Sequence, residues 1–212
     1  MELLTALALT GALLAPPAAG ATRAEAEALA RRVEQRHRTI SDLTARFVQT
    51  YRSGLIGREV VEKGVVSIKR PGRMRWEYRE PEKKTFVANG KTFYFYVPAD
   101  RQVIVRPQAR DRSLPALLLS GQSDLLAEFD VSLDQNAPAG LRRLRLVPRQ
   151  ADPEVEWVTL DVDAADRIRA IALVDVQGNR SRFEFDGIKE NVGLKDRLFD
   201  FRPPAGVEVV AG

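Results

Sequence analysis

The stretch GVVSIKRPGRMRWEY, residues 64–78, predicts two short β-strands joined at Arg70-Pro71-Gly72. Side chains alternate between the two faces of a strand, so residues two apart share a face. One face of the first strand therefore carries Val66, Ile68 and Arg70. One face of the second strand carries Met74, Trp76 and Tyr78, while the charged residues between them point the other way. A sheet with one apolar and one charged face needs a cover on its apolar side, and we expect the rest of the chain to supply it.

Arg70 interrupts this otherwise apolar row, and its position allows two interpretations. An arginine at the end of a strand can rest its aliphatic stem on the apolar face and extend its guanidinium into solvent. Alternatively, the guanidinium can bind whatever covers the sheet. The stretch alone does not decide between them.

The composition limits the classes of function that the chain can have. Its 212 residues are 44% hydrophobic and 29% charged, which is typical of a globular domain with an ample core. The 33 basic residues exceed the 29 acidic ones but are scattered among them, which argues against nucleic-acid binding. The absence of cysteine excludes disulfides, thiol catalysis, cysteine-ligated metals and lipidation of this chain on cysteine. The only histidine, His37, has no second imidazole with which to bind a metal, and we expect it on the surface of a helix.

The first 21 residues are expected to be a secretory signal peptide. Leu3–Ala15 is an apolar run of thirteen residues, which is too short to span a bilayer. Ala19-x-Ala21 follows it and fits the small-residue pattern of a cleavage site. We therefore predict cleavage after Ala21 and a mature chain, residues 22–212, that forms one domain. The alternative is a buried N-terminal helix.

The predicted mature chain begins with a helix and continues with strands. Residues 22–38 lack glycine and proline, and they repeat apolar residues at helical spacing: Ala26, Leu29, Ala30 and Val33. Alternating runs bounded by turn residues then predict about eleven strands, with Asn89-Gly90 as the strongest hairpin signal. Their connections are too short for parallel crossovers, so we expect an antiparallel sheet, and one of this size curls on itself.

Two short leucine-rich helices are expected to interrupt the strands. Ser113 as N-cap, Pro115 in the first turn and Gly121 at the end define the first, and Ser123 is expected to cap the second. These helices either plug an end of the curled sheet or take part in binding. With the sheet they would enclose an apolar container, whose expected lining residues are Phe47, Val66, Ile68, Met74, Trp76, Tyr78, Phe93, Phe95, Leu117 and Leu118.

No catalytic motif accompanies this container. The sequence has no GxSxG motif, Walker-type glycine loop, HExxH motif or glycine-rich dinucleotide turn. We therefore expect no enzyme activity, no metal site and no cofactor, although a pair of carboxylates brought together by the fold would be invisible in the sequence.

Several motifs, taken in order, resemble the LolA family of periplasmic lipoprotein carriers. They are Phe47-x-Gln49, Lys69-Arg70-Pro71, Arg75-Trp76-Glu77-Tyr78, Pro81, Asn89-Gly90-Lys91, Pro115-Ala116-Leu117-Leu118 and Phe199-x-Phe201-x-Pro203-Pro204-x-Gly206-Val207. The resemblance extends from about residue 22 to residue 210. Its implied fold is an unclosed antiparallel β-barrel of about eleven strands, mainly β with short helices that form a lid over an apolar cavity.

The resemblance also implies a function, partners and a role for Arg70. It implies a soluble, monomeric chaperone in the periplasm that binds the acyl chains of lipoproteins from a release transporter in the inner membrane. The cargo would then pass to a receptor at the outer membrane. Arg70 would be a latch that donates hydrogen bonds to helix backbone and holds the lid closed. The alternative is a lipid-binding or lipid-sensing module of the same fold that regulates a periplasmic partner.

Overall fold

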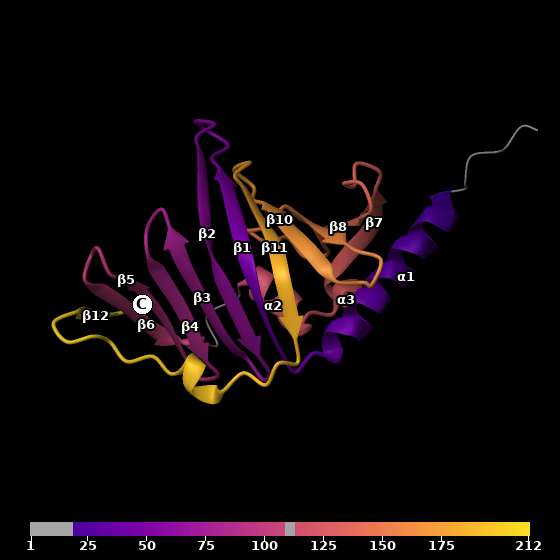
Figure 1. Ribbon diagram of the computed structural model, residues 1–212. Coiled ribbons are helices and arrows are strands. Elements are labelled where there is room, and N and C mark those ends of the chain that lie inside the picture. The colour runs from indigo at the N-terminus through magenta and orange to yellow at the C-terminus, as the bar shows by residue number, and fades with distance from the viewer. Residues whose placement is uncertain (1–18, 109–112) are drawn as a thin grey trace, which may run out of the picture.

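Alternating apolar residues produce twelve strands in the described part of the chain, residues 19–108 and 113–212 of this computed structural model (Figure 1). The strands of the first half are β1 (Asp42–Arg52), β2 (Glu59–Lys69), β3 (Arg73–Glu80), β4 (Lys84–Asn89), β5 (Thr92–Val97) and β6 (Gln102–Pro107). Those of the second half are β7 (Phe129–Asp134), β8 (Arg142–Pro148), β9 (Trp157–Val162), β10 (Ile168–Val174), β11 (Arg180–Glu190) and β12 (Glu208–Ala211). The first eleven confirm the predicted strands, with ends that shift by a few residues.

All twelve strands form one sheet in the order β12-β6-β5-β4-β3-β2-β1-β11-β10-β9-β8-β7. No ladder joins β7 to β12 in the described residues, so the curved sheet is an unclosed barrel. The expected antiparallel, unclosed barrel of about eleven strands is confirmed, with one addition at an edge, where the short strand β12 pairs in parallel with β6. Parallel pairing requires a long connection. Residues 191–207 supply it by returning along the sheet from β11.

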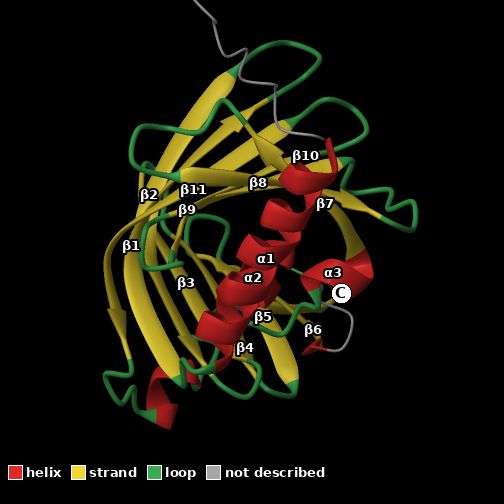
Figure 2. Ribbon diagram, turned by 90° about the vertical axis from the view of Figure 1, so that its right-hand side faces the viewer, coloured by secondary structure: helices red, strands yellow, loops and turns green. Residues whose placement is uncertain are grey.

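Three helices lie on the concave side of the sheet (Figure 2): α1 (Ala19–Arg38), α2 (Leu114–Ser120) and α3 (Leu125–Glu128). The predicted apolar stripe of α1 is confirmed, because Ala26, Leu29, Ala30 and Val33 are all buried. Gly121 ends α2 in the left-handed conformation, at φ 62°, as predicted. The predicted cap of α3 is wrong by one residue. Asp124, rather than Ser123, accepts a hydrogen bond from the backbone nitrogen of Ala127, since its carboxylate reaches the free N–H groups of the first turn.

The main core lies between the concave face and the helices. The two faces of β3 separate as predicted, with Met74, Trp76 and Tyr78 buried and the intervening charged residues partly exposed. Phe47 of β1 lies opposite Gly64 of β2. A Cβ atom on Gly64 would lie 2.7 Å from the Phe47 ring, so glycine is required for this packing.

The convex face has a cover of its own, made by the returning C-terminal segment. The 3₁₀-helix η2 (Asp196–Phe199) packs against β3 and β4, and Phe199 is completely buried. Lys69 and Arg73 bind the Asp196 carboxylate at 2.6 and 2.7 Å. The segment thus crosses the outside of the sheet to deliver β12 to its edge.

No helix among residues 19–108 and 113–212 is long and apolar enough to cross a membrane. The apolar run predicted to belong to a signal peptide lies outside the described residues. The predicted cleavage position, after Ala21, falls within the first turn of α1.

Candidate functional site

An aromatic cluster occupies the centre of the concave face. The Phe47 ring centroid lies 5.0 Å from that of Trp76 and 4.8 Å from that of Tyr78, both in edge-to-face geometry. Trp76 makes the same kind of contact with Phe183 of β11 at 5.4 Å. Offset and edge-to-face pairs are the favourable arrangements of aromatic rings. Strands from both halves of the chain therefore contribute to one apolar surface.

Two cavities lie between this surface and α2. The larger measures about 160 Å³, and its lining residues are Met74, Trp76, Tyr78, Phe86, Phe93, Arg106, Ser113, Pro115 and Phe183. The smaller measures about 40 Å³ and is lined by Ile68, Gly72, Arg73, Met74, Gln108, Ser113, Ala116, Leu117, Ser120 and Gln122. Met74 and Ser113 line both, so the two spaces are neighbours beneath the start of α2.

The structure brings most of the sequence-predicted lining residues to these cavities. Four line the larger one (Met74, Trp76, Tyr78 and Phe93), and Ile68, Leu117 and again Met74 line the smaller one. Phe47, Val66 and Leu118 are buried in the adjoining core and line neither cavity. Phe95 packs against this core from one side and stacks on Phe86, with ring centroids 4.3 Å apart.

Five lining residues of the larger cavity are absent from the predicted set: Phe86, Arg106, Ser113, Pro115 and Phe183. Phe86 shares its strand face with Ala88, and Phe183 shares its face with Phe185, so alternation in these strands was a usable signal. Arg106 lies with its guanidinium carbon 4.5 Å above the Phe93 ring, a cation–π contact that sequence spacing does not reveal.

Tyr78 adds one satisfied polar group to this apolar wall. Its hydroxyl donates a hydrogen bond to Oε1 of Gln49 at 2.6 Å. Burial, with a smaller contribution from the negative charge of Glu62, raises the pKa of Tyr78 well above its usual value. The phenol therefore stays neutral.

Arg70 lies where the ends of two helices meet the sheet. Its Nε and Nη2 donate to the carbonyl oxygen of Ser120 at 2.8 and 2.5 Å, and Nη2 also reaches that of Gly121 at 3.2 Å. On α1, Nη1 donates to the carbonyl oxygen of Arg38 and Nη2 to that of His37, both at 3.0 Å. The guanidinium is thus bound to backbone rather than extended into solvent.

This arrangement follows from the chemistry of helix ends. The last carbonyl groups of a helix lack partners within the helix and carry partial negative charge. One planar guanidinium with five donors can serve two such ends at once. Gly121 makes the approach possible, because a Cβ atom there would lie 2.6 Å from Nη2 of Arg70 and 2.9 Å from the backbone of His37.

His37 is not on the surface, and that expectation is wrong. It is only 4% exposed, and its Nδ1 lies 3.1 Å from the carbonyl oxygen of Leu119 in α2. Burial lowers the pKa of His37 below the ordinary 6.5, so the neutral imidazole donates this hydrogen bond. The sequence contained the signal, because His37 continues the buried stripe of α1 four residues after Val33. Arg70 and His37 therefore join α1 and α2 at the same place.

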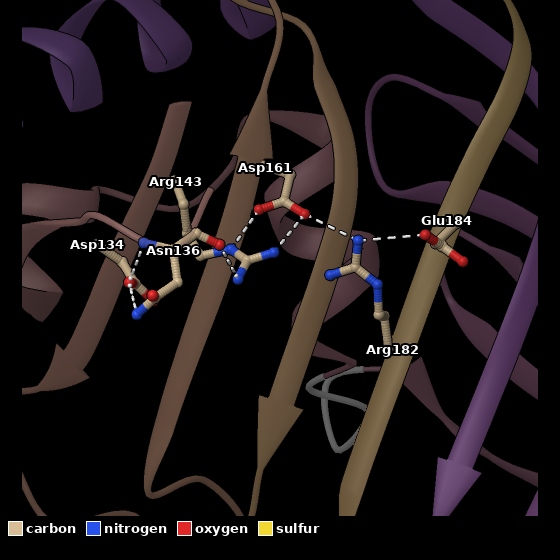
Figure 3. Close-up of polar contacts among 6 residues, drawn as sticks. All are labelled: Asp134, Asn136, Arg143, Asp161, Arg182 and Glu184. Carbon is tan, nitrogen blue, oxygen red and sulfur yellow. Dashed lines mark hydrogen bonds and ion pairs between the residues drawn. The ribbon is translucent and has the colours of Figure 1, made fainter. Parts of the chain in front are cut away.

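A buried ionic network lies on the opposite, convex face (Figure 3). Asp161 of β9 is 0% exposed and accepts hydrogen bonds from Arg143 at 2.6 and 2.9 Å and from Arg182 at 2.8 Å. Burial alone would raise the pKa of Asp161, but the two guanidinium groups outweigh it and lower the pKa. Because this network faces away from the cavities, it joins β8, β9 and β11 without belonging to the apolar site.

The described residues offer little for catalysis or metal binding. No group of three His, Asp or Glu side chains in them is placed to hold a metal ion. Asp42 and Asp161 are the buried carboxylates of the described chain, and both are saturated with donors. Asp42 accepts from the backbone nitrogens of residues 192–194. The site is therefore mainly apolar, and Arg70 and His37 hold the helices that cover it.

The fold and site define a class: incomplete β-barrels whose concave apolar face is covered by helices. Residues 38–202 match the sequence profile of a family described as "Outer membrane lipoprotein carrier protein LolA". The chain belongs to the LolA family.

Known relatives agree with this assignment. An outer-membrane lipoprotein carrier protein from Dechloromonas aromatica is 33% identical over 79% of this chain and 80% of its own. One from Chromohalobacter salexigens is 31% identical over 97% of this chain and 95% of its own. Among solved structures, an uncharacterized conserved protein from Thermus thermophilus has a TM-score of 0.57 at 17% identity, covering 89% of this chain and 99% of its own. That last likeness concerns the fold alone.

Proposed function

We propose that this protein is a lipoprotein chaperone that takes up the acyl chains of lipoproteins in the space between the concave face and α2. The observation that carries the proposal is a wall of aromatic rings under helices that one arginine fastens by their backbone. Each CH₂ group removed from water contributes about 0.8 kcal/mol, so long acyl chains need an escort through an aqueous compartment. The relatives named as outer-membrane lipoprotein carrier proteins support the same interpretation.

The conformation described here is the closed one. Its larger cavity measures about 160 Å³. Pockets that enclose drug-sized ligands measure about 300–1,000 Å³, so acyl chains of ordinary length require more room. Moving α2 away from β3 and β5 would join the two cavities and expose the aromatic wall. Arg70 resists this movement, because its hydrogen bonds to Ser120 and Gly121 exist only while α2 stays in place.

A latch of this kind gives the carrier a means of release. Closing the lid restores the hydrogen bonds of Arg70 and His37, and this gain competes with the binding of cargo. The competition keeps the affinity for acyl chains low enough for delivery to a receptor. We infer that the chain acts as a monomer in the periplasm after removal of residues 1–21, between a release transporter in the inner membrane and a receptor at the outer membrane.

The test uses the two tryptophans of the chain, Trp76 and Trp157. Trp76 lines the larger cavity, whereas Trp157 lies on the other face of the sheet with the guanidinium of Arg145 4.3 Å from its ring. In Trp157→Phe, Trp76 is the sole reporter, and adding a triacylated lipopeptide should shift its emission. In the matched variant Trp76→Phe, the emission of Trp157 should stay constant while the lipopeptide still binds.

Native mass spectrometry of the protein recovered from the periplasm then identifies the natural ligand. A carrier should retain triacylated lipoproteins, and more of them in an Arg70→Leu variant. Retention of unrelated lipids with no lipoprotein, or a silent Trp76 in a chain that binds the lipopeptide by calorimetry, would refute the proposed site.

A further inference from the structure

Two neighbouring loops at the end of the sheet opposite to Arg70 carry three exposed aliphatic residues; the loops join β1 to β2 and β10 to β11 (Figure 1). Leu55 and Ile56, in the loop between β1 and β2, are 88% and 74% exposed. Val176, in the turn between β10 and β11, is 58% exposed. Because β2 separates this loop from Arg70 by eleven residues, the two features lie about 35 Å apart. The cavity and its lid therefore do not explain these residues.

The two loops form one ordered tip. Ser53 donates to the carbonyl oxygen of Arg58, and Gly57 donates to that of Ser53, both at 3.0 Å, which closes the β1–β2 loop on itself. The backbone nitrogen of Gly54 donates to Oδ1 of Asn179 in the neighbouring turn at 3.0 Å. The aliphatic side chains are thus presented on a braced backbone.

Three arginines flank the tip, which also contains the carboxylates of Glu59 and Asp175. Arg52 and Arg180 lie directly opposite each other on β1 and β11, an arrangement of like charges that destabilises a sheet. Arg58 follows in the loop, and Glu59 lies across from Arg52 on β2. Within the described chain, none of the three arginines has a carboxylate within the 4.0 Å of an ion pair. An anionic partner would relieve the repulsion between Arg52 and Arg180.

We propose that this tip, residues 52–58 with residues 175–180, binds the surface of an anionic lipid bilayer. Leu55, Ile56 and Val176 enter the boundary between headgroups and acyl chains, and the flanking guanidinium groups bind lipid phosphates. A bilayer fits better than a protein groove, because the exposed aliphatic residues lie on loops that project from the end of the sheet (Figure 1). The site is separate from the cavity, so it does not depend on the proposed carrier function.

Vesicle sedimentation tests the proposal with the exported chain, its N-terminus verified by mass spectrometry. Binding is expected to vesicles of phosphatidylglycerol and phosphatidylcholine, to fall with salt, and to be weak with phosphatidylcholine alone. An arginine near an anionic surface strengthens binding roughly fivefold, so Arg58→Gln should weaken it by about that factor. Leu55→Glu should weaken binding about tenfold or more, because it replaces an inserted apolar side chain by a carboxylate, whose negative charge the anionic lipids repel. The controls are Arg202→Gln and Val209→Glu, which make the same changes at exposed positions away from the tip and should bind as wild type does.

Insertion is measured separately with Leu55→Trp and phospholipids that carry a shallow fluorescence quencher. The emission of the introduced tryptophan is the difference between the variant and the wild-type chain. On phosphatidylglycerol vesicles this emission should shift to the blue and be quenched. Equal binding of Leu55→Glu and Val209→Glu, or no binding of the wild-type chain to either vesicle, would overturn the proposal. The proposal would also be overturned if Leu55→Trp sediments with the vesicles but its emission is not quenched. If the wild-type chain binds only when a membrane protein is reconstituted in the vesicles, the tip is a protein-docking site instead.

Discussion

Replacing Arg70 by leucine removes the group on which α1 and α2 converge. The Ser120 carbonyl oxygen receives two of its N–H groups and is the closest acceptor on α2. A hydrogen bond to a charged group contributes about 1.5–3 kcal/mol, and we assign that amount to the shared bond with Ser120 alone, since neighbouring bonds are not additive. Because 1.4 kcal/mol is a factor of ten, the open state should gain about tenfold to about a hundredfold in population relative to the closed state.

The assay follows a labelled lipoprotein in two stages, loading onto the carrier and transfer to the receptor. Arg70→Leu should load as well as the wild type or better, hold its cargo longer and deliver it poorly. Arg70→Lys should recover part of the transfer, because an ammonium group supplies a charge but not the planar set of donors. Arg79→Leu is the matched control, since Arg79 is exposed on the same hairpin and makes only a 3.6 Å ion pair with Glu77.

Normal loading and normal delivery by Arg70→Leu would refute the latch. A variant that neither folds nor loads would be distinguished by its melting curve, and Arg70→Lys would then carry the test. The reasoning also fails if Arg79→Leu impairs delivery as strongly as Arg70→Leu, because a general loss of positive charge would explain both.

Three further predictions concern stability. His37 is the only histidine, so an NMR titration of its imidazole measures its pKa directly, and that pKa should lie below 6.5. The neutral ring then stabilises the fold fully above pH 6.5, and this stabilisation is lost as the pH falls below 6.5. Melting curves recorded from pH 8 to pH 5 should show the loss. Asp161→Asn should lower the free energy of unfolding in urea, toward the lower end of about 3–5 kcal/mol, because the partly buried guanidinium groups of Arg143 and Arg182 lose their counter-charge. Asp186→Asn at an exposed pair should change little. Gly64→Ala should lower the melting temperature strongly, since its Cβ would lie 2.1 Å from a backbone oxygen of β3; an unchanged melting curve would mean that the Phe47 packing is not as described.

The sequence was sufficient for the strands and for the face that each presents. Val66, Ile68, Met74, Trp76 and Tyr78 alternate over two joined strands, and all are buried. The last strand was missed because Glu208–Ala211 is only four residues long and its partner β6 lies about a hundred residues earlier. Alternation reveals that a segment is a strand, whereas a distant parallel partner depends on the path of the whole chain.

The site was predictable in its side chains but not in its backbone contacts. Arg70 stood out as a charge in an apolar row, yet its four acceptors are carbonyl oxygens, which every residue possesses. Only the packing of α1 against α2 decides which of them converge. The burial of His37 could have been read from its spacing after Val33, but its partner Leu119 again contributes a backbone atom.

The position of β12 determines when the β6 edge of the sheet becomes covered during synthesis. An uncovered sheet edge is a template for pairing with other chains, and proteins protect such edges. The β7 edge is packed against α1, which is made before it, whereas β6 is covered by residues 208–211, which are made about a hundred residues after it. During synthesis, β6 therefore stays open until residues 208–211 have been made, and a truncation after Phe201 would leave this edge of the sheet exposed. In this fold β12 completes the sheet and also helps to decide whether neighbouring molecules stay apart.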